Sequence, residues 1–252
     1  MQENSPATSG IPFLALIIPA YNEERRIKST LEKVTNYLQS QNYSWEVIVV
    51  DDGSTDMTAS VVSNFAKTHS GLSLLSIPHK GKGSAVRAGM LHTKGQYRFM
   101  CDADLSMPIE QLERFLPAKI GDYDLALGSR EIAGANRFQE PPHRHLMGRL
   151  FNTLVRFMAV PGFMDTQCGF KCFAGITADH LFSLQRINGF AFDVEIMYLA
   201  SRKGLKIKEV PIDWYYEEES KVRPIRDSLL MITNILRIHL ASFAGKYDPT
   251  GR

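Results

Sequence analysis

Apolar and polar positions alternate along the first half of the chain in blocks that predict strands followed by helices. The predicted strands are short apolar runs at residues 13–18, 45–50, 72–77, 97–100 and 124–127. The predicted helices, with apolar residues on one face, are residues 23–39, 57–68 and 83–91. This β-α-β-α order predicts an α/β fold: a mostly parallel sheet with helices on both of its faces.

Two later segments, 145–160 and 225–245, predict amphipathic helices with few charges. Each places apolar residues at helical spacing and carries two arginines, Arg149 and Arg156 in the first, Arg226 and Arg237 in the second. Apolar amphipathic helices with sparse arginines are typical of a membrane interface. Helices that pack on the sheet or form a homodimer have the same pattern, so composition alone leaves these alternatives open.

The domain organisation follows from the lack of an internal repeat or a low-complexity linker. We predict a disordered N-terminal tail at residues 1–10, one α/β domain at 11–220, and a C-terminal amphipathic helix with a tail at 221–252. The N-terminal tail lacks the apolar region of a signal peptide, and no run of about 20 apolar residues exists. A cytoplasmic protein that is peripheral to the membrane is the expectation.

Composition narrows the function classes. With 44% hydrophobic and 22% charged residues the chain reads as an ordinary globular protein, and its net charge of only +2 gives no basis for nucleic-acid binding. Cys101, Cys168 and Cys172 are odd in number and match no disulfide framework, which favours a reducing compartment. They also lack a second pair at zinc spacing.

Polar residues stand where four of the predicted strands end. These groups are Tyr21-Asn22-Glu23, Asp51-Asp52, Asp102-Ala103-Asp104 and Ser129-Arg130. In open sheets of parallel strands, ligands bind beyond the carboxyl ends of the strands. The coincidence of four polar strand ends therefore predicts a binding site at this edge.

Asp102 and Asp104 form the strongest candidate for a metal site. On an extended segment, residues two apart point to the same side, and hard dications such as Mg²⁺ or Mn²⁺ take carboxylate oxygens. Most such triplets are solvated loops or helix caps, but this one follows an apolar strand and accompanies other acidic strand ends. Ser106 could add a ligand or cap a helix that starts at Pro108.

The nucleoside side of the predicted site is built from the first two strand ends. Ser54 and Asp56 are better placed than Asp52 to cap the next helix, which leaves Asp52 to accept hydrogen bonds from a uracil or a ribose. Tyr21 and Glu23 could merely pack or stabilise a helix start. Together with Pro19, however, they form a rigid turn with an aromatic face and a carboxylate.

Lys82 lies between two glycines at a predicted helix N-terminus, where backbone amides and the helix dipole favour an anion. The stretch is not a Walker A loop, because that spacing is missing. A solvated basic loop is an equally good interpretation.

Three motifs resemble the family-2 glycosyltransferases of GT-A fold. They are Pro19-Ala20-Tyr21-Asn22-Glu23, Asp51-Asp52-Gly53-Ser54 and Asp102-Ala103-Asp104. Later runs resemble the dolichyl-phosphate β-glucosyltransferase branch: Asp165-Thr166-Gln167-Cys168-Gly169-Phe170-Lys171, Ala191-Phe192-Asp193-Val194-Glu195 and Glu219-Ser220-Lys221-Val222. The similarity spans roughly Leu14 to Gly245.

The resemblance implies roles for these residues. The nucleotide-sugar is held by Pro19, Tyr21, Glu23, Asp52, Lys82, Asp102 and the Ala103 backbone. Asp102 and Asp104 hold Mg²⁺ or Mn²⁺ on the diphosphate, and Arg130 faces the phosphates or the acceptor. Asp193 and Glu195 fall where relatives keep acidic residues near the acceptor.

The reaction implied is transfer of glucose from UDP-glucose to a polyprenyl phosphate at the cytoplasmic face of a membrane, with inversion to a β-linked product. A dication stabilises the departing diphosphate, and Asp104 takes part in the reaction because it holds that dication. An ionised lipid phosphate needs positive charge more than a base, and the candidate sources are Arg130, Lys171, Lys221 and Arg223. A hydroxyl acceptor would instead require Asp193 or Glu195 as general base.

Three alternatives stay open at this point. The donor could be GDP-mannose, or the acceptor could be soluble. A non-catalytic nucleotide-sugar-binding module is disfavoured because Asp102 and Asp104 are both intact.

Overall fold

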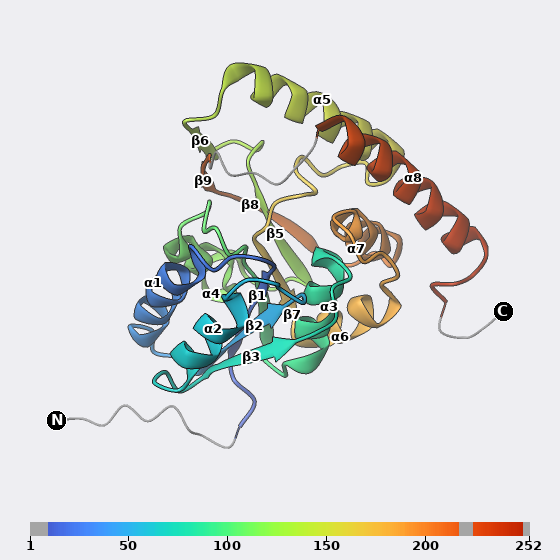
Figure 1. Cartoon of the computed structure of the whole chain (residues 1–252). Helices are drawn as coiled ribbons and strands as arrows, with labels where there is room; N and C mark the ends of the chain where they lie inside the picture. Colours follow the sequence, from blue (N-terminus) through green and yellow to red (C-terminus); the bar gives the residue numbers. More distant parts are fainter. Residues whose placement is uncertain (1–9, 217–223, 249–252) are drawn as a thin grey trace.

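A seven-stranded sheet with the order β3-β2-β1-β4-β7-β5-β8 forms the centre of the computed structural model, which describes residues 10–216 and 224–248 (Figure 1). Its strands are Leu14–Ala20 (β1), Trp45–Asp51 (β2), Leu72–Ser76 (β3), Tyr97–Met100 (β4), Leu125–Ser129 (β5), Lys171–Ala174 (β7) and Ile207–Pro211 (β8). All neighbouring pairs are parallel except those of β7, which runs antiparallel to both β4 and β5. The predicted α/β fold with a mostly parallel sheet is confirmed.

Helices cover both faces of the sheet, as predicted. On one face lie α1 (Ile27–Gln39), α2 (Thr58–Ala66) and the 3₁₀ helix η1 (Ile109–Phe115). On the other lie α3 (Lys82–His92), α5 (Pro142–Met158), α6 (Gly175–Leu184), α7 (Phe192–Arg202) and α8 (Pro224–Phe243). A short helix, α4 (Pro117–Ile120), follows η1, and a small two-stranded sheet pairs β6 (Asn136–Phe138) with β9 (Asp213–Tyr215).

The pattern within β1 shows why the sheet is buried on both sides. Leu14, Leu16 and Ile18 belong to the apolar layer under α1, whereas Ala15 and Ile17 belong to the layer under α3. Successive strand residues point to opposite faces, so a continuous apolar run buries both.

Several boundaries differ from the sequence predictions, and two of these differences have identifiable reasons. Pro19 lies inside β1 and not at its end. It is paired with β2, but β4 pairs with β1 only as far as Ile17, so no bond to β4 needs the missing N–H of Pro19. Helix α1 begins at Ile27 and not at Glu23, because residues 23–26 form a turn in which the Glu23 carbonyl accepts the Arg26 and Ile27 amides.

Helices α5 and α8 pack on one another beside α7 (Figure 1). The inner stripe of α8 is Met231, Ile235, Ile238 and Ser242, all buried. Its outer stripe is Leu229, Leu236, Leu240 and Phe243, whose side chains are between 52% and 95% exposed. Both stripes recur at helical spacing on opposite sides of α8, so this helix has an apolar face left uncovered within the described residues.

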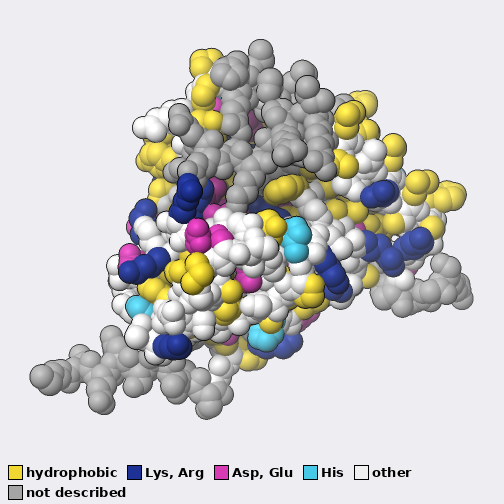
Figure 2. Space-filling model, viewed as in Figure 1, with side chains coloured by type: hydrophobic (Ala, Val, Ile, Leu, Met, Phe, Trp, Pro, Cys, Tyr) yellow, Lys and Arg dark blue, Asp and Glu magenta, His cyan; other side chains and the backbone are white. Residues whose placement is uncertain are grey.

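Hydrophobic side chains, with Lys and Arg among them, are visible on the side of the molecule where α8 lies (Figure 2). In the stretches 10–216 and 224–248, none of the helices has the length and apolar character needed to cross a bilayer.

Candidate active site

The carboxyl ends of β1, β2, β4 and β5 meet at one edge of the sheet, together with the start of the antiparallel β7. This edge collects the predicted residues Tyr21, Asp52, Asp102, Arg130 and Lys171 from five strands. Four polar strand ends therefore converge as the sequence predicts, and the reversed direction of β7 adds a fifth.

The first turn of the site is fixed by hydrogen bonds from the segment before α2. The backbone N–H of Asn22, which has a positive φ of 54°, donates to Ser54 Oγ at 2.9 Å. The backbone N–H of Glu23 donates to Thr58 Oγ1 at 2.8 Å, and its carboxylate lies 3.0 Å from Arg26 Nε. The Tyr21–Glu23 turn is thus held against a neighbouring element, which suits a rigid recognition surface.

Asp52 is buried and organises the basic loop that follows β3. Its carboxylate accepts the backbone N–H groups of Lys80 at 2.9 Å and Gly81 at 2.8 Å, and lies 2.8 Å from His79 Nδ1. The imidazole of His79 stacks on Tyr21 with ring centroids 4.1 Å apart. The sequence predicted that Asp52 would be free to accept hydrogen bonds from a nucleoside, without these internal partners. It did not identify His79, because no motif surrounds this residue.

Asp102 and Asp104 lie just past β4, beside Lys82. Lys82 Nζ is 2.6 Å from Asp102 Oδ1, and Asp104 Oδ1 accepts the Ser106 N–H at 3.0 Å. Burial, together with the neighbouring Asp102 carboxylate, raises the pKa of Asp104 above its ordinary value. The segment is anchored from behind, because the buried Thr30 hydroxyl donates to the Ala103 carbonyl at 2.6 Å.

Gly169 lies against the Asp102 carboxylate, and only a glycine fits at this position. A Cβ at Gly169 would lie only 2.1 Å from Asp102 Oδ2, so any side chain there would displace the carboxylate. The start of β7 therefore packs directly on one face of Asp102, while Lys82 occupies another.

The carboxylates of Asp102 and Asp104 suit a hard dication whose remaining coordination positions are filled by a bound ligand. Among the described residues, no three His, Cys, Asp or Glu side chains converge on a metal position. Mg²⁺ and Mn²⁺ sites of nucleotide-processing enzymes commonly use one or two carboxylates and substrate phosphates. Asp102 and Asp104 supply such a pair, and both side chains are partly accessible.

Arg130, at the end of β5, is clamped by Asp165. Its Nε and Nη2 atoms donate to the two carboxylate oxygens of Asp165 at 2.6 and 3.0 Å, and its backbone N–H also donates there. Burial would raise the pKa of Asp165, but the charge and hydrogen bonds of Arg130 lower it. The guanidinium also lies 5.6 Å from the centre of the Trp214 ring.

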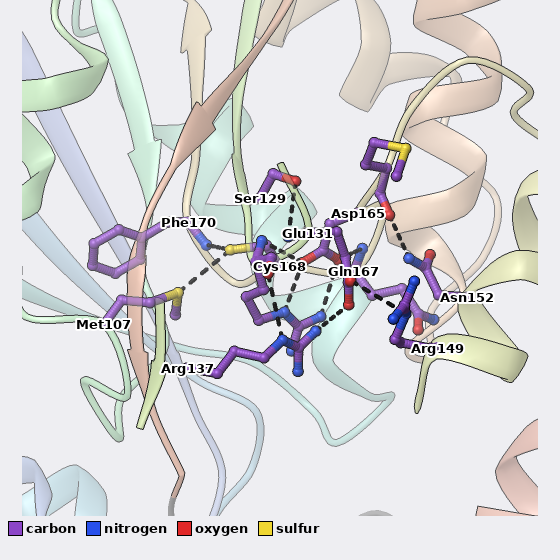
Figure 3. A network of polar contacts seen from close by, with 12 residues as sticks. Met107, Ser129, Glu131, Arg137, Arg149, Asn152, Asp165, Gln167, Cys168 and Phe170 are labelled. Carbon is purple, nitrogen blue, oxygen red and sulfur yellow. Dashed lines mark hydrogen bonds and ion pairs between the residues drawn. The ribbon is translucent and has the colours of Figure 1, made fainter. Parts of the chain in front are cut away.

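The network around Asp165 extends toward α5 (Figure 3). Arg137 contacts Glu131, and Arg149 Nε lies 3.8 Å from the other oxygen of Glu131. Asn152 of α5 donates to the Met164 carbonyl. Asp165 belongs to a motif singled out in the sequence, but its role as partner of Arg130 was not predicted.

Lys171 does not fit the predicted contact with an acceptor phosphate. Its side chain is 1% exposed, and its ammonium donates to Asp193 Oδ1 and to the Cys168 carbonyl, each at 2.6 Å. An ion pair enclosed in this way balances charge inside the protein. The structure therefore gives Lys171 an internal partner and no accessible ammonium, because β7 lies between β4 and β5 and encloses this side chain.

Asp193 and Glu195 occupy the first turn of α7, and neither is placed as a general base. Asp193 is the partner of Lys171. Glu195 is fully buried, and its carboxylate accepts the backbone N–H groups of Arg186 and Ile187 and the hydroxyl of Tyr247. Glu195 therefore holds the segment before α7 and the end of the chain together.

Lys221 and Arg223, predicted to bind the acceptor, lie outside the described residues.

Residues 15–175 match the family profile described as "Glycosyl transferase family 2". A dolichyl-phosphate beta-glucosyltransferase of Trichomonas vaginalis is 35% identical over 95% of this chain and 77% of its own length. The enzymes of that name from Saccharomyces cerevisiae and Homo sapiens are each 32% identical over 93% of this chain, and 76% and 77% of their own lengths.

Solved structures agree on the fold. Glucosyl-3-phosphoglycerate synthase from Mycobacterium tuberculosis in complex with UDP has a TM-score of 0.63 at 21% identity, covering 90% of this chain and 80% of that one. Its complex with Mn²⁺, UDP and glucosyl-3-phosphoglycerate has a TM-score of 0.61 at 19% identity, covering 91% and 79%.

Proposed function

The chain belongs to glycosyl transferase family 2, and from this premise we propose that it is an inverting glucosyltransferase that moves glucose from UDP-glucose to a polyprenyl phosphate of dolichyl type. The similarity to dolichyl-phosphate beta-glucosyltransferases over nearly the whole chain carries this proposal. The reaction requires a divalent metal and takes place at the cytoplasmic face of a membrane.

On the donor side, the chain offers an aromatic ring and polar groups to a nucleoside. Tyr21, Glu23 and Asp52 come from two adjacent strand ends, with the buried Pro19 beneath them in β1, and the Ala103 backbone follows the neighbouring β4. A uracil ring would have to share or take over the face of Tyr21 on which His79 stacks. Lys82 is within reach of a diphosphate held over Asp102.

Asp102 and Asp104 would hold Mg²⁺ or Mn²⁺, which when bound supplies positive charge to the diphosphate as it leaves. The protein's own part is to keep these carboxylates in place: Thr30 anchors the segment and Gly169 supports Asp102. Preorganised groups of this kind lower the barrier because they need no rearrangement during the reaction.

Arg130 is the best-placed cation for the acceptor. Asp165 fixes two of its three guanidinium nitrogens, and within the described residues Nη1 donates no hydrogen bond. A phosphate is already ionised near neutral pH and needs a fixed positive charge to approach the donor. The burial of Asp193 and Glu195 favours such an acceptor over a hydroxyl that would need a general base.

The test is a panel of donors and acceptors. With Mn²⁺ or Mg²⁺ present, UDP-glucose should raise the melting temperature more than GDP-mannose, since a ligand stabilises the state that binds it. Transfer to a short polyprenyl phosphate should then yield a β-linked glucosyl lipid. A larger shift with GDP-mannose would refute the donor, and transfer to 3-phosphoglycerate but not to lipid would refute the acceptor.

The outer stripe of α8 is the proposed membrane contact. Leu236 and Leu240 lie in that stripe, with Arg237 beside it, the combination expected of an interfacial helix. Replacing both leucines by Glu should abolish flotation with vesicles that contain anionic lipid, and should leave UDP-glucose binding unchanged. Ile176→Glu is the matched control, because Ile176 on α6 is 88% exposed but outside the stripe. If the double variant loses a dimer and still floats with the vesicles, the stripe is a homodimer interface and not a membrane contact.

A further inference from the structure

Lys82 stands between acidic groups that come from different elements. Its ammonium is 2.6 Å from Asp102 Oδ1, and the ion pair of Asp193 with Lys171 lies along the same edge. Burial alone would lower the pKa of Lys82, but the charges of Asp102, Asp193 and Asp104 raise it above the ordinary value. The ammonium is therefore charged and already serves as the cation of this acidic cluster.

The backbone around Lys82 is fixed, so the ammonium reaches Asp102 from a defined position. Gly81 donates its N–H to Asp52 at 2.8 Å, and Ser84 donates its N–H to the Asn188 carbonyl at 3.1 Å. A Cβ on Gly83 would lie 2.7 Å from the Ile187 carbonyl oxygen, which shows how closely the start of α3 packs on the segment before α7.

Asp102 cannot easily turn away from Lys82. Gly169 packs on one side of its carboxylate, and the Thr30 bond to Ala103 fixes the backbone next to it. A dication at Asp102 and Asp104 would therefore lie close to the Lys82 ammonium, and like charges at such a distance repel. A diphosphate removes this repulsion, because its oxygens can coordinate the dication and also accept hydrogen bonds from the ammonium.

We propose that Lys82 couples binding of the metal to binding of the nucleotide. Without a ligand it neutralises Asp102 and keeps the metal affinity low; when a diphosphate binds, Lys82 transfers to the phosphate oxygens and Asp102 becomes available to the metal. This inference rests on the proposed function, and it predicts that metal and UDP bind far more tightly together than alone.

The experiment is calorimetric titration of Mn²⁺ alone, UDP alone and UDP with saturating Mn²⁺. The proteins are wild type, Lys82→Met, Lys82→Arg and Lys80→Met. Lys82→Met should bind Mn²⁺ alone at least about tenfold more tightly than wild type, because the ammonium that neutralises Asp102 is then absent. Its coupling, the ratio of Mn²⁺ dissociation constants without and with UDP, should fall by at least about tenfold.

The controls separate charge from structure. Lys82→Arg keeps a cation and should retain weak binding of Mn²⁺ alone, whereas general damage to the loop would affect both variants. Lys80→Met removes an exposed charge two residues away and should leave the Mn²⁺ affinity within about twofold of wild type. Unfolding curves of all variants establish that each is folded.

The outcomes distinguish the inference from the function on which it rests. Equal or weaker binding of Mn²⁺ alone to Lys82→Met would overturn the role of Lys82, whatever the donor is. Failure of the wild-type protein to bind UDP even with Mn²⁺ would overturn the proposed donor, while the comparison of Mn²⁺ alone between wild type and Lys82→Met would still decide whether Lys82 keeps the metal affinity low.

Discussion

Two acidic pairs with the same spacing, Asp102/Asp104 and Asp193/Glu195, have different structural settings. The first pair follows β4 at the sheet edge, and both side chains are partly accessible. The second lies in the first turn of α7, where two residues span about 200° of the helix, so Asp193 points to Lys171 and Glu195 to Tyr247. Spacing alone does not make a site; the element that carries it decides whether two carboxylates can share a ligand.

The two acidic pairs also differ in the charges and hydrogen-bond donors that surround them. Asp102 and Asp104 face each other's charge, which a bound cation would relieve, whereas Asp193 is neutralised by an ammonium and Glu195 by three hydrogen-bond donors. The first pair is thus suited to bind something from outside, and the second to hold the protein together.

The largest effect is expected for Asp104→Ala, which should lower the turnover number by about 10³-fold or more and leave the melting temperature nearly unchanged. The loss of repulsion from Asp102 offsets the loss of the hydrogen bond from the Ser106 N–H. Rates with UDP-glucose and unfolding curves test this prediction. Asp122→Ala, which removes an exposed carboxylate before β5, serves as the control. Normal turnover in a folded Asp104→Ala protein would contradict the metal assignment.

Asp193→Asn should lower the free energy of unfolding by about 3 kcal/mol, because it leaves the enclosed Lys171 ammonium without a counter-charge. Urea denaturation measures this loss. Lys171→Met in the same protein should restore part of the stability, since removing both charges avoids the isolated ion. A single variant as stable as wild type would show that Asp193 is not needed to neutralise Lys171.

Glu195→Gln should cost about 2 kcal/mol of stability, because an amide cannot accept from all three donors. Burial raises the pKa of Glu195, against the opposing hydrogen bonds of Tyr247 and the backbone. The wild-type contribution of this group is therefore complete below about pH 4.5 and is lost as the pH rises through the raised value. Urea denaturation across this range should show that fall in wild type only; identical pH profiles would contradict it.

Tyr247→Phe should have the smallest effect, about 1 kcal/mol, because two backbone donors remain on Glu195. The turnover number should stay within about twofold of wild type. A large loss of turnover without loss of stability would place the Glu195 region in catalysis after all and would remove the contrast between the two pairs.

The strand ends and the Asp102/Asp104 segment were predictable from the sequence, because parallel strands bring their carboxyl ends to one edge and apolar runs identify the strands. The position of Lys171 was not, because nothing in its local pattern shows that β7 runs antiparallel between β4 and β5. The partnership of Arg130 with Asp165 and the stacking of His79 on Tyr21 join distant residues, which neither periodicity nor spacing reveals.

The strand order has a consequence for how the protein opens. One side of the sheet, β3-β2-β1-β4, comes from residues 14–100, and the other, β7-β5-β8, from residues 125–211, so the β4–β7 pairing is the seam between two consecutive stretches of chain. Asp102 and Gly169 touch at the end of that seam. A nucleotide-sugar donor and a metal bound there would hold the two stretches of chain together. Amide hydrogen exchange in β4 and β7 would then slow more than in the outlying β3 and β8.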